Sequence, residues 1–352
     1  MSKRIIVNSE NGETRAAIVE NGVLVDLFIE RSLHPRYASN IYKGVVENVL
    51  PGMQAAFVNV GLERNVFLYV DDALAVRNGQ GIRGSRAGDD DEPLPPKRSR
   101  SIKDILKTGQ EIIVQVTKEP IGTKGARVVT DITLPGRYVV LMPTVDYVGV
   151  SRRIASEAER DRLRKIAQGN KPRKMGVIVR TVAEGRSEEE IAGDIQFLVK
   201  LWRRIQARAR RAKAPAMLHK DYDLVFRLVR DHFSEDVEAF ILDDVEEHKK
   251  VMGLMKMLPE HMAERVRLYT GSEPLFDVYG LEEEIARAIR RKVWLNCGGY
   301  LIIDHTEALT VIDVNTGKFT GSTCLADTVF RTNLEAAVEI ARQLRLRNIG
   351  GI

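Results

Sequence analysis

Three short strand-like runs near the N-terminus, at residues 4–8, 14–20 and 23–29, predict a β-meander. Asn11-Gly12 and Asn21-Gly22 join the runs, and Asn-Gly is a strong signal for a tight hairpin turn. Three strands of this length cannot enclose a core alone. We therefore expect them to pair with a later part of the chain.

From about residue 40 to residue 132 the pattern is all-β, with short runs separated by turns that contain glycine or proline. The predicted strands cover residues 42–50, 53–60, 65–70, 111–118 and 126–131. Five such strands fit an OB-type barrel, a fold often used to bind single-stranded nucleic acid. Phe57 and Phe67 could stack on bases or pack in the core. Lys118 and Lys124 near the rim could contact phosphates.

A polar segment at residues 77–100 interrupts this β region. It is rich in Gly, Asp, Arg, Ser and Pro and has almost no large apolar residue. Such a composition cannot bury enough surface to fold, so we predict a disordered loop between barrel strands.

A mixed α/β segment follows, with strands predicted at 138–142 and 176–181. Ser151-Arg152-Arg153 leads into a predicted charged helix that reaches about residue 168. Ser187 and Glu190 form a capping box for a second helix that reaches about residue 213. Arg180 and Thr181 end the second strand. An arginine fork beside a hydroxyl suits a phosphate pocket, and a salt bridge from Arg180 to a nearby acid is the alternative.

Helical spacing dominates from residue 222 to residue 292, with helices predicted at 223–233, 244–258 and 281–292. A hairpin follows, and then a helix capped by Asp327 or Thr328 that runs to about residue 346. The apolar face predicted for this last helix consists of Val329, Phe330, Leu334, Val338, Ala341 and Leu344.

The second strand of that hairpin lies in the run ALTVIDVNTG at residues 308–317. Because side chains alternate along a strand, Asp313 and Asn315 point to one face, and Ile312 and Val314 point to the other. A carboxylate and an amide carbonyl are hard oxygen ligands of the kind that magnesium prefers. The alternative is that Asp313 and Asn315 only shape a turn.

Composition bounds the class of protein. A chain of 352 residues is expected to form two or more domains, and its charge of +5 permits a polyanionic partner. Seven basic residues and no acid lie between Lys200 and Lys213, on a helix that is either solvated or binds phosphates. Cys297 and Cys324 form no Cys-x-x-Cys pair, so we expect free thiols in a reducing cytoplasm. No apolar run approaches the length of a membrane span.

Four segments together resemble the ribonuclease E/G family, with the closer likeness to its ribonuclease G branch. They are EALTVIDVNTG, NLEAAVEIARQLRLRNIGGI, NIYKGVVENVLPGMQAAFVNVG and IGTKGARVVTDITLPGRYVVLMP. The likeness covers the chain except for the insertion at 77–100. It implies an endoribonuclease that cuts single-stranded RNA with a magnesium-activated water, acts in rRNA maturation and RNA decay, and forms a homo-oligomer at full length.

The resemblance also implies an α/β multidomain architecture. Residues 1–38 and 223–288 would be two pieces of an RNase H-like domain. An OB-fold at 39–131 and a 5′-sensor domain at 132–222 would be inserted between them. Residues 289–352 would be a truncated DNase I-like catalytic domain.

Site residues follow from the resemblance by motif. Asp313 matches a magnesium-holding aspartate, and Asn315 matches a residue that supports it by hydrogen bonding. Phe57, Phe67 and Lys124 match RNA-contacting positions. The positions that match a pocket for a 5′-monophosphate, or a basic pair near it, are Gly136, Val140, Arg180, Thr181, Arg152 and Arg153.

Two departures from the family limit these expectations. A second magnesium-binding aspartate would follow Ile352, so we expect the 352-residue fragment to bind RNA and to cleave it poorly or not at all. The family's zinc link would also lie beyond Ile352, and zinc is not assigned to Cys297 or Cys324. The competing hypothesis is a non-catalytic RNA-binding protein that uses the OB-fold.

Overall fold

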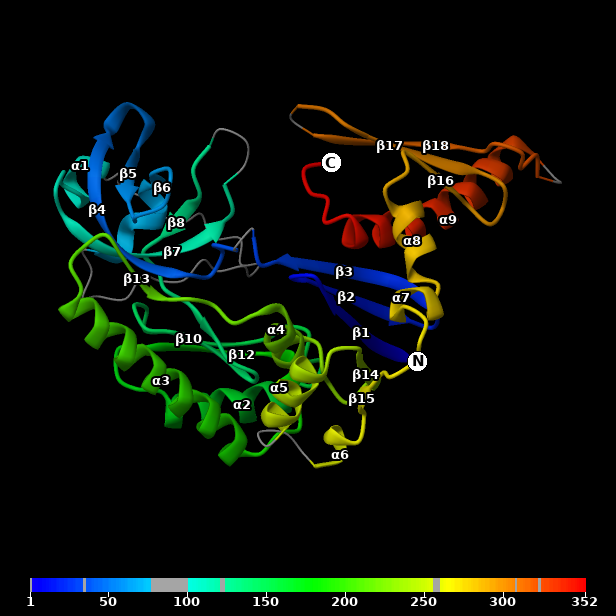
Figure 1. Cartoon of the computed structure of the whole chain (residues 1–352). Coiled ribbons are helices and arrows are strands. Elements are labelled where there is room, and N and C mark those ends of the chain that lie inside the picture. The colour runs from blue at the N-terminus through cyan, green and yellow to red at the C-terminus, as the bar shows by residue number, and fades with distance from the viewer. Residues whose placement is uncertain are drawn as a thin grey trace. The chain divides into compact units, whose positions relative to one another are not determined.

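The computed structural model describes residues 2–33, 36–76, 101–120, 124–255, 260–307, 309–321 and 324–352 (Figure 1). Contacts divide the chain into two units, one formed by Arg36–Tyr222 and the other by Met1–Pro35 with Asp223–Ile352. The loop predicted at 77–100 lies outside the described residues. No described helix is both long enough and apolar enough to cross a membrane.

The first unit contains a closed barrel of five strands, as the sequence predicts. Its strands are β4 (Ile41–Leu50), β5 (Ala55–Asn59), β6 (Val66–Tyr69), β7 (Glu111–Lys118) and β8 (Arg127–Val129). They pair in the order β4-β5-β6-β8-β7, and β4 also pairs with β7, which closes the ring. Strand β13 (Ala216–His219) adds to β4. The short helices of this region are η1 (Pro51–Met53), η2 (Val70–Val76) and α1 (Ile102–Ile105).

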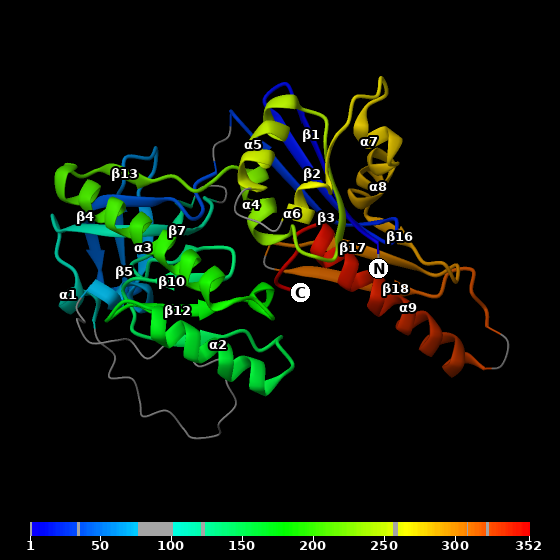
Figure 2. The same cartoon turned by 90° about the horizontal axis from the view of Figure 1, so that it is seen from below.

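The rest of this unit is a small α/β layer. Its sheet has the order β11-β12-β10-β9. The strands are β9 (Leu134–Pro135), β10 (Val139–Met142), β11 (Val148–Val150) and β12 (Gly176–Val179). Helices α2 (Glu157–Asn170) and α3 (Glu188–Arg211) pack side by side on this sheet (Figure 2).

The helix starts depend on local caps. The predicted capping box of Ser187 and Glu190 is present at the start of α3. The segment Ser151-Arg152-Arg153 leads toward the other helix, which starts a few residues later. Helix α2 begins after Ser156, whose side chain accepts the Glu159 N–H, because a side-chain acceptor there satisfies a donor of the first turn.

The second unit is built on a sheet with the order β15-β14-β1-β2-β3. Its strands are β1 (Lys3–Glu10), β2 (Glu13–Glu20), β3 (Val23–Arg31), β14 (Val237–Leu242) and β15 (Val266–Leu268). The meander turns at Asn11-Gly12 and Asn21-Gly22, whose four residues have positive φ. Strand β1 pairs in parallel with β14, so the meander finds its partner late in the chain, as expected.

Helices cover both faces of this sheet. Ile5 and Val7 lie in a core with α4 and α5, whereas Ile6 lies in a second core with α7 and α8. The helices are α4 (Leu224–Asp231), α5 (Val245–Met255), α6 (Glu260–Ala263), α7 (Leu275–Val278) and α8 (Leu281–Ala288). The prediction that α8 continues to residue 292 is wrong, because Lys292 already belongs to the next strand.

The last part of the chain is a three-stranded sheet with one long helix. The order is β16-β17-β18, with β16 (Lys292–Trp294), β17 (Tyr300–His305) and β18 (Thr310–Asn315). The sequence predicts the hairpin and misses β16. The N-cap residue of helix α9 (Leu325–Leu346) is Cys324, which makes no side-chain cap, so the predicted caps at Asp327 and Thr328 are wrong.

The predicted apolar face of α9 is also wrong. Phe330, Leu334 and Val338 are 61%, 55% and 74% exposed. The helix instead buries Thr328, Thr332 and Ala336. Small side chains permit close packing, and each threonine hydroxyl donates to a backbone carbonyl four residues earlier. Threonines on a helix can therefore face the protein core without leaving a polar group unsatisfied.

Asp194 on α3 connects this helix to the turn between β9 and β10. One carboxylate oxygen accepts the backbone N–H of Tyr138 at 2.8 Å and that of Val139 at 3.0 Å. Burial raises the pKa of Asp194 above its ordinary value of 3.8, and the hydrogen bonds only partly offset this. The carboxyl therefore supports a turn that also contains Gly136.

Asp194→Ala should lower the free energy of unfolding by about 2–6 kcal/mol, because two buried N–H groups lose their acceptor at about 1–3 kcal/mol each. Asp194→Asn should retain most of this stability, since one amide oxygen can replace the single oxygen that accepts both bonds. Urea denaturation of the three proteins measures the difference.

The same variants test the pKa of Asp194. A carboxyl whose folded pKa is raised favours the fold most when it is protonated. The stability of wild type relative to Asp194→Asn should therefore be greatest below about pH 3.9 and should fall as pH rises through the folded pKa. An increase of this difference with pH would contradict the assignment.

Candidate functional site

Strand β18 separates its polar and apolar side chains as predicted. Ile312 and Val314 pack against a core that contains Leu301 of β17 and Ala336 of α9. Asp313 is exposed on the opposite face. Asn315 lies beside it and donates a hydrogen bond from Nδ2 to Oδ2 of Asp313 at 2.9 Å.

The donor set at this pair suits a hard cation. Asp313 makes no ion pair with any cation in the described part of the chain, so its carboxylate is not already neutralised there. The Asn315 bond orients the carboxylate. Magnesium commonly binds through one or two carboxylates and completes its shell with water and substrate phosphate. The described residues contain no group of three or more His, Cys, Asp or Glu arranged to hold a metal.

Three further residues share the sheet face of Asp313. Tyr300 of β17 lies directly opposite Asn315, and Trp294 of β16 lies opposite Tyr300. Lys292 places its ammonium over both rings. The sequence interpretation missed this group because β16 has only three residues and begins shortly after α8 ends at Ala288, so no alternation is visible.

The turn before β17 is fixed from α9. Glu335 accepts the backbone N–H groups of Asn296 and Cys297, the latter at 3.1 Å. Burial acts to raise the pKa of Glu335, but hydrogen bonds from Cys297 and the two N–H groups outweigh it and lower the pKa. The ionised carboxylate thus holds the hairpin that delivers β18.

On the barrel, Phe57 and Phe67 lie opposite each other on β5 and β6. Their ring centroids are 5.8 Å apart in an edge-to-face arrangement. Their strand neighbours Ala56 and Leu68 are fully buried, whereas both phenylalanines are half-buried. The rings therefore lie on the outer face of the barrel and not in its core. Tyr69, which the sequence interpretation did not select, follows on the same face.

Lys124 is exposed next to this face. The following residue, Gly125, approaches β6 so closely that a Cβ would lie 2.1 Å from the carbonyl oxygen of Asn65. Phe67 then donates its N–H to Ala126 at 2.8 Å. Only glycine permits this approach, and the approach places Lys124 beside the start of β6.

The predicted phosphate-pocket residues form a connected group at the end of β12. Arg180 donates from Nη1 to the carbonyl oxygen of Gly136 at 2.7 Å. A Cβ on Gly136 would lie 2.5 Å from Asp194 Oδ2, so glycine is required there. Thr181 and Ser151 share a hydroxyl hydrogen bond of 2.8 Å.

Ser151 links this group to the basic pair. The backbone N–H of Arg153 donates to the Ser151 hydroxyl at 3.4 Å, and Arg152 and Arg153 are both exposed after β11. Val140 lies on β10 between Ile178 and Pro135. The sequence interpretation did not select Ser151 or Asp194, which have no distinguishing local pattern.

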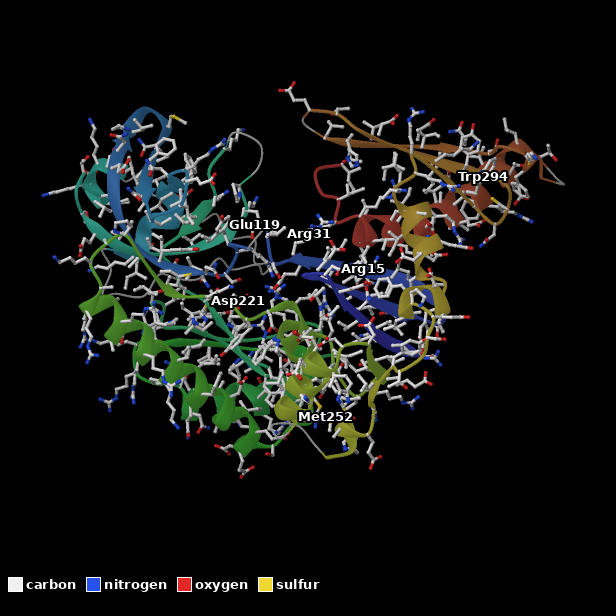
Figure 3. The ribbon with its side chains drawn as sticks, in the orientation of Figure 1. Arg15, Arg31, Glu119, Asp221, Met252 and Trp294 are labelled. Carbon is white, nitrogen blue, oxygen red and sulfur yellow. The ribbon has the colours of Figure 1, made fainter. Side chains whose placement is uncertain are left out.

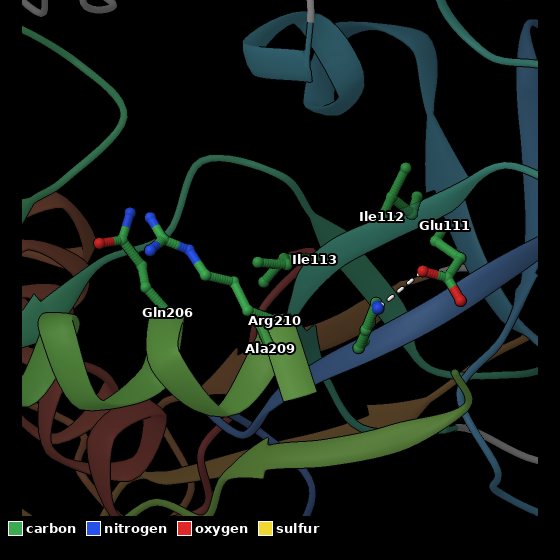
Figure 4. Close-up of a pocket in the computed structure, with 7 residues that line it drawn as sticks. Glu111, Ile112, Ile113, Gln206, Ala209 and Arg210 are labelled. Carbon is green, nitrogen blue, oxygen red and sulfur yellow. Dashed lines mark ion pairs between the residues drawn. The ribbon is translucent and has the colours of Figure 1, made fainter. Parts of the chain in front are cut away.

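A hollow of about 320 Å³ lies between α3 and strands β4 and β7 (Figure 4). Lys43 and Glu111 form an ion pair of 2.6 Å at its wall, and the Lys43 hydrogen bond lowers the pKa of Glu111. Ile112 and Ile113 supply apolar surface, and Arg210 lies across from them on α3. None of the predicted site residues lines this hollow.

Comparison with known proteins gives a consistent result over the whole chain. A family model described as "Ribonuclease E/G family" matches residues 133–352. Ribonuclease G of Salmonella typhimurium (strain SL1344) and that of Escherichia coli (strain K12) are each 42% identical over 352 residues, which cover 100% of this chain and 70% of the relative. Ribonuclease E of Nostoc sp. is 42% identical over 364 residues, which cover 100% of this chain and 49% of the relative. The chain therefore belongs to the ribonuclease E/G family.

Proposed function

We propose that this protein is a magnesium-dependent endoribonuclease that cleaves single-stranded RNA. The observation that supports this most directly is the Asp313–Asn315 pair, exposed on a strand inside the region that matches the family. The relatives named ribonuclease G and ribonuclease E give the class of reaction.

The residues of β18 have separate roles in this proposal. Asp313 would hold the magnesium ion, and Asn315 keeps the carboxylate oriented through its 2.9 Å bond. A bound magnesium ion would supply an activated water and stabilise charge on the scissile phosphate, so no protein nucleophile is needed.

The barrel would hold the RNA strand. Phe57 and Phe67 offer aromatic surface on the outer face, where bases can stack, and Lys124 offers a nearby positive charge for a phosphate. Such contacts tolerate different sequences, because every base has an aromatic face.

The group at the end of β12 would bind a 5′-monophosphate. Arg180 supplies a charged donor, Thr181 a hydroxyl, and Arg152 and Arg153 an exposed positive pair. The Gly136 turn and Val140 would complete the pocket. RNA that has lost its 5′-triphosphate would be preferred.

The finer architecture is part of the same proposal. The sheet that joins β1–β3 to β14 and β15 would be the RNase H-like domain, and the sheet of β16–β18 would begin the DNase I-like domain. We also propose that the protein acts in rRNA maturation and RNA decay in the cytoplasm and forms a homo-oligomer.

Asp313→Asn should reduce cleavage of 5′-monophosphorylated single-stranded RNA by more than about 100-fold. Asn315→Ala should reduce it by about 10- to 100-fold, which is the usual effect of losing a residue that orients a metal ligand. The assay compares magnesium with EDTA, in the 352-residue chain and in a form extended to the length of the ribonuclease G relatives. Asp304→Asn on β17 is the matched control. RNA binding without magnesium-dependent scission would identify a non-catalytic RNA-binding protein instead.

Phe57→Ala and Phe67→Ala should each weaken RNA binding by about 5- to 150-fold, the factor expected for one lost base stack. The rate of scission at saturating RNA should change less. Phe197→Ala removes an exposed phenylalanine from α3 and serves as the control. Fluorescence anisotropy of labelled RNA measures binding, and equal affinities for all three variants would count against the barrel assignment.

Arg180→Ala should abolish any preference for 5′-monophosphate over 5′-triphosphate RNA, because the charged donor of the pocket is lost. Arg173→Ala removes an exposed arginine before the other end of β12 and should leave the preference intact. Competition between the two RNAs in one reaction measures the preference. If wild type cuts both equally, the pocket assignment is wrong.

A further inference from the structure

The face of the three-stranded sheet that contains Asp313 also contains an aromatic pair. Trp294, Tyr300 and Asn315 lie in one row across β16, β17 and β18. Lys292, Ile302 and Asp313 form the adjacent row on the same face. Neighbouring strands are about 4.8 Å apart, so the indole begins about 10 Å from the Asp313–Asn315 strand.

The two rings and the lysine form one contact group. The ring centroids of Trp294 and Tyr300 are 5.3 Å apart at an interplanar angle of 66°. The Lys292 ammonium lies 3.9 Å from the centroid of the indole and 3.6 Å from that of the phenol. Lys292 makes no ion pair with a carboxylate in the described ranges, so its positive charge is not neutralised there.

This aromatic pair does not serve the core of the sheet. Val293 and Leu295 point to the opposite face and pack with Leu301 and Ala336. Trp294 is 57% exposed, and Figure 3 shows its side chain among those of the β16–β18 region. An exposed indole beside an unneutralised lysine and a polar strand offers stacking surface together with positive charge.

We propose that Lys292, Trp294 and Tyr300 form a second RNA-contacting surface, which stacks a base and binds a phosphate of the nucleotides next to the scissile bond. The proposal rests on the proposed function of Asp313. Single-stranded RNA is the occupant that fits, because it combines aromatic bases with negative charge, and the group combines rings with a cation. A purely apolar partner would offer no negative charge to Lys292.

The chain offers a direct spectroscopic test, because it has only two tryptophans. Trp202 is 5% exposed within α3, and Trp202→Phe leaves Trp294 as the single tryptophan, which is excited selectively over the nine tyrosines. Addition of a single-stranded oligonucleotide should quench this emission saturably, at the concentrations where labelled RNA binds by anisotropy. The titration is made with calcium or without metal, so that cleavage does not interfere.

Substitutions give the second readout. Trp294→Ala should raise the Kd for RNA by about 5- to 150-fold, whereas Trp294→Phe should retain most of the affinity, because the phenyl ring still stacks. Lys292→Gln should reduce the slope of log affinity against log salt concentration by about 1, the change expected for one lost phosphate contact. Phe330→Ala on α9 removes another exposed aromatic and should leave RNA binding unchanged.

The outcomes separate this inference from the proposed function. If RNA binds and is cleaved, but the emission of Trp294 and the Kd of Trp294→Ala do not change, the second surface is overturned and the endoribonuclease proposal stands. If emission changes only with protein concentration and light scattering rises with it, a second copy covers this face and the inference is wrong. If RNA neither binds nor is cleaved, the proposed function itself fails.

Discussion

The alternation of side chains along β18 is the constraint on which the candidate site depends. Ile312 and Val314 must face the core formed with α9, and this requirement alone turns Asp313 and Asn315 outward. A slip of one residue in register would bury the carboxylate and expose the valine. The stability of a small hydrophobic core therefore sets the position of the chemical groups.

The same two-residue period orders the barrel. Ala56, Val58, Val66 and Leu68 fill its interior, and Phe57 and Phe67 consequently lie outside, where they contact each other and solvent. Packing considerations alone leave open whether a strand phenylalanine belongs to the core. The closed ring of strands decides the question, because its interior is already occupied by the alternate positions.

The sequence predicts the elements with a strong local pattern and fails where tertiary packing decides. The Asn-Gly turns, the capping box at Ser187 and the alternation at Asp313 are local, and each was predicted correctly. Strand β16 is too short for a period, and α9 faces its sheet through threonines instead of its larger apolar residues. The sequence pattern places Asp194 on the surface of a helix. Only the folded structure brings its carboxyl to the turn at Tyr138.

Electrostatics gives a reason for cations around Asp313. A phosphate about 4 Å from its carboxylate would be repelled by about 1 kcal/mol in water and about 4 kcal/mol at an effective dielectric constant of 20. Arg291 Nη2 lies 2.6 Å from Oδ2 of the nearby Asp304, so the charge of that arginine is already neutralised. The Lys292 ammonium lies over two aromatic rings and forms no ion pair with a carboxylate in the described part of the chain. In the proposed function, a bound cation and Lys292 would offset the charge of Asp313 as RNA approaches this face, and both would act most strongly on a phosphate that lies between them.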